Sequence, residues 1–537
     1  METDAVNAGI ELSWTRAASE VLSVPDALDR ASLAHSHREY LRFPHLGISL
    51  SFSETQERSS QLAHWLRAHG VEPGDRVAVM LDNVPAWPLS WYAILRNRAC
   101  VVPVNPRYRH SDIGHVLKDS GARLVLTSKE RIGLVEDAVS ASAPNCQVVD
   151  VAAALAAAEG LDVTALGDLP KAKRDDLANL QYTSGTTGFP KACMLTHDFW
   201  LRTGAVVGES AGVDRNDVSI MAQAWSYVDQ QWMTTMCVLS GTPHVVLERF
   251  SASGFWPAIR ANAATVTYVL GAMPVLLYKQ PATTSDNENR MRVVLCSAIP
   301  KDLHRQLEQR WSTPWREVYG STETGVDLIA GIDDTDTVGS GALGRPPAGK
   351  KVSVVDEFGH PADKAVTGEI VVEGKPMMLG YWNHPEATEK VLDRGRYHSG
   401  DRGYFDSAGY VHHDGRIKDM IRRGGENIAA GEVEAVISTH PAVLSVAVVG
   451  IPDDIYGEIP KAFVIANAGH TRSEEVARSI LDHAHSQLAA FKVPTLIEFC
   501  DAFPMTPSQR VEKRKLLAIK SNHRSGSYEY DPRSRRH

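Results

Sequence analysis

The spacing of apolar residues in the first 130 positions changes repeatedly, which predicts alternating helices and strands. Between residues 53 and 70 the apolar positions recur at helical spacing. A Pro-Gly-Asp turn at 73–75 then leads into the continuous apolar run 77–81, which is typical of a buried strand. Four further segments continue this alternation: 85–94, 100–104, 111–120 and 122–127. This part of the chain therefore predicts an α/β fold with a largely parallel sheet.

The later pattern predicts three more structural parts. Apolar segments bounded by turns (245–247, 265–270 and 292–295) indicate a second doubly wound sheet. From residue 350, short alternating strands separated by Gly and Pro indicate a small β-barrel (351–356, 368–373 and 409–413). Beyond residue 416, two helical patterns and three strand patterns indicate a separate α+β unit (431–439 and 473–491; 444–450, 461–465 and 495–499).

The length of 537 residues is too great for one compact core, so at least two domains are expected. We expect a large N-terminal α/β domain over residues 1–417, with two doubly wound sheets and the small barrel. A small, mobile α+β C-terminal domain would span 418–521. Residues 522–537 contain several Arg and no periodicity, so they predict a disordered tail.

Composition narrows the class of partner. Hydrophobic residues make up 43% of the chain and charged residues 23%, and no run is long enough to cross a bilayer. The net charge of −9 argues against nonspecific binding to nucleic acid. The N-terminus lacks the features of a secretory signal, and the six scattered cysteines include no CxxC pair. We therefore expect a cytoplasmic protein with reduced thiols that binds small molecules. The sequence sets no oligomeric state.

Residues 182–191 have the chemistry of a phosphate-binding loop. They combine hydroxyl donors with glycines that let the backbone approach a ligand: Thr183, Ser184, Gly185, Thr186, Thr187 and Gly188. Lys191 adds a positive charge. The stretch is not a Walker A loop, because Lys191 follows Gly188 by three residues and precedes Ala192. The alternative is a flexible surface linker.

Other segments supply complementary chemistry. The stretch 317–325 contains an aromatic face, a hydroxyl donor and a hard oxygen ligand within five positions: Tyr319, Gly320, Ser321, Thr322 and Glu323. Ser297 and Ala298 follow an apolar strand. Asp401 could hold a ribose diol through both carboxylate oxygens, with Arg416 beside it. Taken alone, the first stretch could be any polar turn, and the Asp401–Arg416 pair could be a surface salt bridge.

The loop 182–191 resembles, nearly letter for letter, the phosphate loop of the adenylate-forming superfamily, which includes acyl-CoA synthetases, adenylation domains and luciferases. The resemblance implies ATP and Mg²⁺, with residues 183–191 holding the β- and γ-phosphates. By the same resemblance Tyr319 would face adenine, Thr322 would donate to the α-phosphate and Glu323 would bind Mg²⁺. Ser297 and Ala298 would line the adenine and acyl carboxylate, while Asp401 and Arg416 would bind ribose or phosphate.

The resemblance covers about residues 50–520, in order. Within the superfamily, residues 247–256, 271–273 and 423–427 are similar to the crotonobetaine/carnitine-CoA-ligase-like branch. Lys418 would be the pivot about which the C-terminal domain turns between the two half-reactions.

Two positions depart from the family pattern. The terminal motif that normally ends in Gly-Lys has Gln509 and Arg510 instead, so the lysine that bridges the acyl carboxylate and α-phosphate is absent there. Arg keeps the charge but is planar and larger. Lys513, about one helical turn further on, is a substitute candidate.

The second departure lies in residues 222–232, where Ser226-Tyr227 replaces the usual Phe-His pair. Trp225, Tyr227 and Trp232 would form a flat-walled pocket suited to an aromatic or other planar acid. Ordinary core aromatics are the alternative. Asp229 would meet a substrate amino group or else be a solvated acid. The pocket is also expected to include two further residues, Gly271 and Ala272.

The resemblance implies ATP-dependent activation of a carboxylic acid as acyl-AMP with pyrophosphate release, followed by transfer to CoA. The implied catalytic residues are Lys191, Thr322, Glu323 and either Arg510 or Lys513. One alternative is a non-CoA acceptor, as in amide synthesis or the activation of nitrite to diazotise an aryl amine. Another is a nucleotide-binding regulator without turnover.

Overall fold

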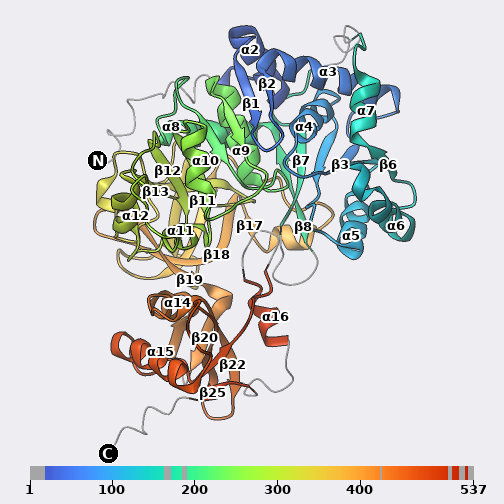
Figure 1. Ribbon diagram of the computed structural model, residues 1–537. Coiled ribbons are helices and arrows are strands. Elements are labelled where there is room, and N and C mark those ends of the chain that lie inside the picture. The colour runs from blue at the N-terminus through green and yellow to red at the C-terminus, as the bar shows by residue number, and fades with distance from the viewer. Residues whose placement is uncertain are drawn as a thin grey trace, which may run out of the picture. The chain divides into compact units, whose positions relative to one another are not determined.

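The computed structural model describes residues 18–162, 171–183, 190–423, 426–505, 511–518 and 526–529. Within these ranges the chain forms α/β sheets in its N-terminal part and a smaller α+β portion near the C-terminus (Figure 1). The predicted fold class is therefore confirmed. The first strands form because buried β-branched residues follow each turn, as in Val77 and Val79.

The first sheet has the strand order β6-β5-β3-β4-β7-β8. Neighbouring strands are parallel except β8, which is antiparallel to β7. The strands are β3 (Arg76–Met80), β4 (Cys100–Pro103), β5 (Leu124–Thr127), β6 (Gln147–Asp150), β7 (Leu177–Thr183) and β8 (Lys191–Thr196). The helices of this region are α3 (Phe52–Ala68), α4 (Ala86–Arg96), α5 (His110–Ser120), α6 (Ile132–Ser142) and α7 (Val151–Ala158).

The second sheet has the order β14-β13-β12-β11-β9-β10-β1-β2. Its inner strands from β13 to β1 are parallel, and β14 and β2 pair antiparallel at the edges. The strands are β1 (Glu39–Phe43), β2 (Ile48–Ser51), β9 (Ser219–Met221), β10 (His244–Val246), β11 (Val266–Leu270), β12 (Val293–Ser297), β13 (Trp315–Ser321) and β14 (Gly325–Ile329). The helices are α2 (Val24–His35), α8 (His197–Ser210), α9 (Val228–Ser240), α10 (Phe255–Ala261), α11 (Met273–Tyr278) and α12 (His304–Trp311).

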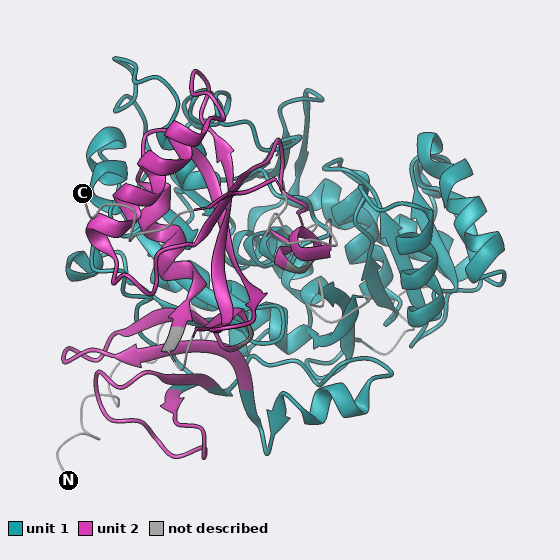
Figure 2. Cartoon of the chain, turned by 90° about the horizontal axis from the view of Figure 1, so that it is seen from below, with its two compact units in different colours: residues 1–352, 372–397 teal, residues 353–371, 398–537 magenta. Residues whose placement is uncertain are grey.

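The chain divides into two compact units, coloured separately in Figure 2. Unit 1 comprises residues 1–352 and 372–397, and unit 2 comprises 353–371 and 398–537. The expected domain boundary at residue 417 stays a prediction, and in this division segments before it group with the C-terminal part. A five-stranded sheet occupies the region where a small barrel was expected: β15 (Lys350–Val355), β16 (Gly368–Gly374), β17 (Leu392–Asp393), β18 (Arg396–Phe405) and β19 (Val411–Arg416).

Unit 2 contains a sheet of order β21-β20-β23-β24-β25, with β22 paired to β23. Its strands are β20 (Met420–Arg423), β21 (Glu426–Ala429), β22 (Val443–Asp453), β23 (Gly457–Ala466), β24 (Leu496–Phe499) and β25 (Tyr528–Glu529). The helices are α14 (Ala430–Ser438), α15 (Glu474–Gln487) and α16 (Lys513–Ala518). Strand β25 falls inside the expected disordered tail. It pairs antiparallel with β24, and the ring of Tyr528 lies with its centroid 6.0 Å from that of Phe499.

All six cysteines are free and five are buried, in agreement with the expectation of unpaired thiols. Among the described residues, no helix has both the length and the apolar character required to cross a membrane.

Candidate active site

The two ends of the expected phosphate loop lie on neighbouring strands of a hairpin. Thr183 ends β7 and pairs in register with Lys191, which begins β8. Residues Ser184, Gly185, Thr186, Thr187 and Gly188 lie outside the described residues. The hairpin therefore positions the lysine and the first threonine of the loop at its two ends.

The corner at residues 319–325 is the turn between β13 and β14. Its tight backbone requires glycine at position 320, because a Cβ there would lie 1.9 Å from the carbonyl oxygen of Gly325. Thr322 and Glu323 occupy the turn itself, and Tyr319 precedes it on β13. The predicted nucleotide-binding residues of this corner thus lie within one hairpin.

Tyr381 connects the phosphate loop to this corner. Its hydroxyl donates a hydrogen bond of 2.8 Å to Oε1 of Glu323. The ammonium nitrogen of Lys191 lies 5.5 Å from the centroid of its ring, in cation–π geometry. Burial raises the pKa of Tyr381, so the hydroxyl remains a donor at neutral pH. Lys191 and Glu323, which are 132 positions apart, therefore both contact the side chain of Tyr381.

The position of Tyr381 is fixed by backbone pairing. The N–H of Met194 donates to the carbonyl of Gly380, and the N–H of Leu379 donates back to Met194, both at 2.9 Å. The N–H of Met378 donates to the carbonyl of Glu323 at 2.6 Å. Sequence reasoning missed Tyr381, because the segment around it has no strand or helix periodicity.

A buried ion pair supports the corner. Lys350 Nζ lies 3.0 Å from Asp327 Oδ1, and their side chains are 0% and 2% exposed. The same ammonium donates to the carbonyl oxygen of Thr324 at 2.7 Å, and the hydroxyl of Thr324 donates to Asp327. Because Thr324 adjoins Glu323, this network fixes the backbone that presents the expected metal ligand.

The loop after β12 is held by a buried carboxylate. Glu317 accepts hydrogen bonds from the N–H groups of Ala298 at 2.7 Å and Ile299 at 2.8 Å. Ala298 has φ +71°, a left-handed conformation that alanine rarely adopts. The Ser297 hydroxyl donates to the carbonyl of Val318. Burial raises the pKa of Glu317 to about 8. Sequence reasoning quoted Glu317 within the corner motif but did not assign this role.

The predicted acid pocket divides into core and site residues. Trp225 is fully buried, stacks on Trp87 with centroids 5.7 Å apart, and donates its indole N–H to Thr234. Its contacts are those of a core residue, as the alternative interpretation held. Tyr227 is half-buried, and its hydroxyl accepts a 2.7 Å hydrogen bond from Asn105 Nδ2.

The remaining pocket candidates lie beyond β9 and β11. Trp232 packs edge-on against Tyr268, with ring centroids 5.5 Å apart. Asp229, in the first turn of α9, is half-buried. Gly271 and Ala272 are exposed and precede α11.

These segments share one edge of the second sheet. Strands β9, β11, β12 and β13 are parallel neighbours, and the segments that begin at residues 222, 271, 298 and 322 follow their carboxyl ends. In open α/β sheets, ligands bind at the carboxyl ends of the strands. The structure therefore brings the corner, the Ser297–Ala298 loop and the pocket segments to the edge where a ligand is expected.

The other predicted residues belong to unit 2. Asp401 and Arg416 are register partners in β18 and β19, with Arg416 Nε 2.8 Å from Asp401 Oδ1. Lys418 lies in the single turn Ile417–Asp419. Lys513 Nζ lies 2.7 Å from Glu434 Oε1, while Arg510 lies outside the described residues.

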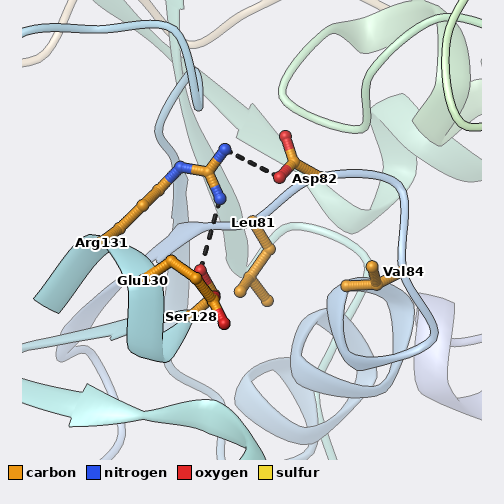
Figure 3. A pocket seen from close by; sticks show the side chains of 6 residues that line it. All are labelled: Leu81, Asp82, Val84, Ser128, Glu130 and Arg131. Atoms are coloured by element: carbon orange, nitrogen blue, oxygen red, sulfur yellow. Dashed lines mark hydrogen bonds and ion pairs between the residues drawn. The ribbon is translucent and has the colours of Figure 1, made fainter.

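A separate cavity of about 510 Å³ lies between the loops that follow β3 and β5 (Figure 3). Arg131 crosses it to reach Asp82 at 2.7 Å and Ser128 at 3.3 Å. None of the motif residues lines this cavity.

Comparison with known proteins tests the family to which these motifs point. The sequence profile of the family described as AMP-binding enzyme matches residues 28–382, and the profile of the AMP-binding enzyme C-terminal domain matches residues 432–510. The chain belongs to the AMP-binding enzyme family. The superfamily resemblance proposed from the loop 182–191 is thus confirmed.

Relatives in this AMP-binding enzyme family span most of the chain. It is 31% identical to the crotonobetaine/carnitine–CoA ligase of Proteus mirabilis over 87% of this chain and 92% of that protein. It is 33% identical to a feruloyl-CoA synthase of an Amycolatopsis species over 87% of this chain and 94% of that protein.

Solved structures of this fold agree with the family assignment. ATP-bound MatB from Rhodopseudomonas palustris aligns with a TM-score of 0.82 at 26% identity, covering 92% of this chain and 98% of that chain. The o-succinylbenzoate CoA synthetase of Bacillus subtilis, in complex with its acyl-adenylate intermediate, aligns with a TM-score of 0.82 at 24% identity, covering 92% of this chain and 98% of that chain. The latter likeness shows the shared fold.

Proposed function

We propose that this protein activates a carboxylic acid with ATP, forming an acyl-AMP and releasing pyrophosphate, and then transfers the acyl group to CoA. The observation that carries this proposal is the junction at Tyr381, which joins Lys191 to Glu323. Lys191 is a cation that can bind the terminal phosphates, and Glu323 is a carboxylate that can bind the metal ion. A site for a nucleoside triphosphate with its metal needs both groups. The family membership supports the same reaction.

In the first step, an oxygen of the acid attacks the α-phosphorus of ATP and pyrophosphate leaves. Lys191 and the hydroxyl groups of residues 183–187 hold the β- and γ-phosphates, and Thr322 donates to the α-phosphate. In the second step, the CoA sulfur attacks the acyl carbon and AMP leaves. The residues act by position and electrostatics, since they form no covalent bond with the substrate.

The donor set fits a magnesium ion. Mg²⁺ in nucleotide sites takes one or two carboxylates and completes its shell with phosphate oxygens and water. Glu323 supplies one carboxylate, of which Oε1 accepts the Tyr381 hydroxyl and Oε2 accepts no hydrogen bond from the described residues. The ion supplies charge neutralisation for the phosphates. No cluster of three or more acidic, His or Cys ligands occurs among the described residues.

Arg510 is the better candidate for the cation that bridges the acid and the α-phosphate. Lys513 already forms a 2.7 Å ion pair with Glu434, whose Oε1 also accepts the N–H of Val448. Withdrawing Lys513 would leave a largely buried carboxylate unpaired, which is costly. Asp401 and Arg416 contribute the ribose contacts, and Lys418 the pivot.

The acid is aromatic or otherwise planar, and CoA is the acceptor. Tyr227, which is half-buried, provides an aromatic face, and the family relatives are named as a CoA ligase and a CoA synthase. An amine or nitrite acceptor is the competing reaction of the same adenylate. Adenylation is common to both, so the two functions differ only in the second step.

Pyrophosphate release tests the first step. The purified protein is incubated with MgATP and a panel of aryl acids, then with CoA, amines or nitrite. We expect acid-dependent pyrophosphate release, and thioester formation only with CoA. Acid-independent hydrolysis, or no release with any acid, would refute adenylation. Adenylation followed by amide or diazonium formation would refute only the assignment of CoA as the acceptor.

Variants at the two cations test their assignment. Arg510→Lys should retain measurable adenylation and Arg510→Ala should lose about a hundredfold, while Lys513→Ala should chiefly lower thermal stability. A hundredfold loss of adenylation in Lys513→Ala with an unchanged melting temperature would reverse the assignment.

A further inference from the structure

Helix α5 contacts the β7–β8 hairpin on both sides of the expected phosphate loop. The hydroxyl of Tyr182, in β7, donates a 2.6 Å hydrogen bond to Oδ2 of Asp119. Nε2 of His115 lies 2.9 Å from the carbonyl oxygen of Pro190, which directly precedes Lys191. Because a carbonyl oxygen only accepts hydrogen bonds, this imidazole nitrogen is the donor. One helix therefore holds a residue before the loop and a residue after it.

Both contacts come from one face of α5. His115 and Asp119 are four residues apart, a spacing that places their side chains on the same side of the helix. The rings of His115 and Tyr182 also pack edge-on, with centroids 6.2 Å apart. Burial, and then the hydrogen bond with Asp119, raise the pKa of Tyr182, so its hydroxyl keeps its proton and Asp119 accepts. Because helical geometry fixes the separation of the two side chains, it also constrains the two sides of the hairpin.

The same end of α5 contacts the segment that carries Tyr381. The carbonyl oxygen of Asp119 accepts hydrogen bonds from the indole N–H of Trp382 at 3.2 Å and from Nδ2 of Asn383 at 3.3 Å. The main-chain N–H of Trp382 donates to the carbonyl of Ala192, on β8, at 2.9 Å. Asp119 thus contacts the hairpin through its side chain and the Tyr381 segment through its main chain. A substitution of its side chain removes the first contact and leaves the acceptor of the second in place.

We propose that His115 and Asp119 are positioning residues for the terminal phosphates of ATP. This inference rests on the proposed function, in which Lys191 holds the β- and γ-phosphates. The two side chains act through Pro190 and Tyr182, which set where the hairpin presents Lys191. A small displacement of a positioned group costs much of its effect. Loss of one contact should therefore weaken binding of the terminal phosphates and slow the release of pyrophosphate.

Two nucleotides distinguish positioning from general support of the fold. MgATP carries the terminal phosphates and AMP lacks them, whereas both contain adenine, ribose and the α-phosphate. Tyr182→Phe removes the hydroxyl and keeps the ring. In this variant we expect the Kd for MgATP to rise about tenfold and the Kd for AMP to change by less than about twofold. The kcat for pyrophosphate release should fall by about tenfold with every acid.

Substitutions of Asp119 test the same hydrogen bond from its other side. Asp119→Ala should reproduce the selective loss of MgATP affinity, and the double variant with Tyr182→Phe should lose no more than either single variant, because one hydrogen bond is removed in all three. Asp119→Asn keeps an acceptor oxygen for the tyrosine hydroxyl and should retain most of the affinity. Asp137→Asn, which removes a charge from the exposed surface of α6, is its matched control.

His115→Phe tests the second contact. The substitution keeps a ring beside Tyr182 and removes the donor to Pro190, so the Kd for MgATP should rise about fivefold with that for AMP unchanged. Thermal unfolding of each variant shows whether it is folded, and the isosteric Tyr182→Phe carries the test if Asp119→Ala is not.

The outcomes separate this inference from the proposed function. Equal losses of affinity for MgATP and AMP in Tyr182→Phe, or no loss for either nucleotide, would overturn the positioning role while acid-dependent pyrophosphate release by the wild type stands. Failure of the wild type to bind MgATP or to release pyrophosphate with any acid would instead refute the proposed function.

Discussion

The corner at residues 319–325 and the segments proposed to line the acid pocket share the carboxyl edge of one sheet, but they are built differently. The corner is fixed by backbone pairing, by a glycine with no room for a Cβ, and by the buried Lys350–Asp327 pair. The pocket contains half-buried side chains, two exposed small residues and buried polar atoms without partners among the described residues.

This difference separates the invariant part of the reaction from its variable part. The nucleotide and its metal present the same phosphates in every turnover. A rigid corner is therefore preorganised for them and does not limit which acids can react. The acid differs between relatives that share the fold, and unmet polar atoms let a small change of side chain alter the substrate. Changes at the corner should therefore reduce activity with every acid, and changes at the pocket should alter the order of preference among acids.

The largest expected effect comes from breaking the buried pair. Lys350→Met leaves Asp327 charged and unpaired, which should lower the free energy of unfolding by about 3–5 kcal/mol. The double variant Lys350→Met/Asp327→Leu should recover much of that stability but not the adenylation rate, because Thr324 loses its anchor. Thermal unfolding and pyrophosphate release measure the two properties. Equal stability of wild type and Lys350→Met would show that the pair does not support the corner.

Removing the expected metal ligand should abolish most of the rate without unfolding the protein. Glu323→Gln keeps the size and the acceptor for Tyr381 but removes the charge, so adenylation should fall about a hundredfold, or roughly 3 kcal/mol. The loss should be equal for every acid that the wild type activates. A loss that depended on the acid would place Glu323 in the acid pocket and remove the contrast between the two regions.

The carboxylate of Glu317 predicts a pH-dependent difference in stability. Its pKa is raised from 4.5 to about 8 by burial, so the folded protein holds a proton that the unfolded chain has lost between these values. The stabilisation from this proton is complete below pH 4.5 and is lost as the pH rises toward 8. The stability advantage of the wild type over Glu317→Gln should therefore narrow by about 3–4 kcal/mol from pH 5 to pH 8. Parallel stability curves for the two proteins would contradict this account.

The smallest effect is expected at the junction itself. Tyr381→Phe removes the hydrogen bond to Glu323 but keeps the ring beneath Lys191, so kcat should fall about tenfold, near 1.4 kcal/mol. The concentration of Mg²⁺ needed for half-maximal rate should rise with it. An unchanged magnesium requirement would mean that the hydroxyl does not orient the metal ligand.

Local chemistry was predictable from the sequence wherever a motif carried its own spacing. Lys191, Glu323 and the glycine at 320 were proposed in this way, because hydroxyl, glycine and charged residues cluster within ten positions. The strand pattern also predicted the sheets that bring these motifs together.

Contacts between distant residues were not predictable from periodicity. Tyr381 lies in an irregular segment whose geometry depends on pairing with β8, and Lys350 begins an ordinary strand, so neither has a local signal. Trp225 was expected in the pocket, yet a fully buried tryptophan next to Trp87 serves the core. Tyr528 contacts Phe499, which lies 29 positions earlier, and its strand pairs with β24. In each case packing across the fold, rather than local pattern, decides the position.

Equilibrium binding of MgATP tests the central claim, which is that Lys191 and Glu323 meet at Tyr381 to form one nucleotide site. We predict saturable binding by calorimetry to the wild type and to Asp137→Asn, and affinity at least about tenfold weaker in both Lys191→Ala and Glu323→Gln. Because the two changes act on one site, their double variant should lose less than the sum of the single losses. No binding to the wild type, or equal affinity in all five proteins, would contradict the account.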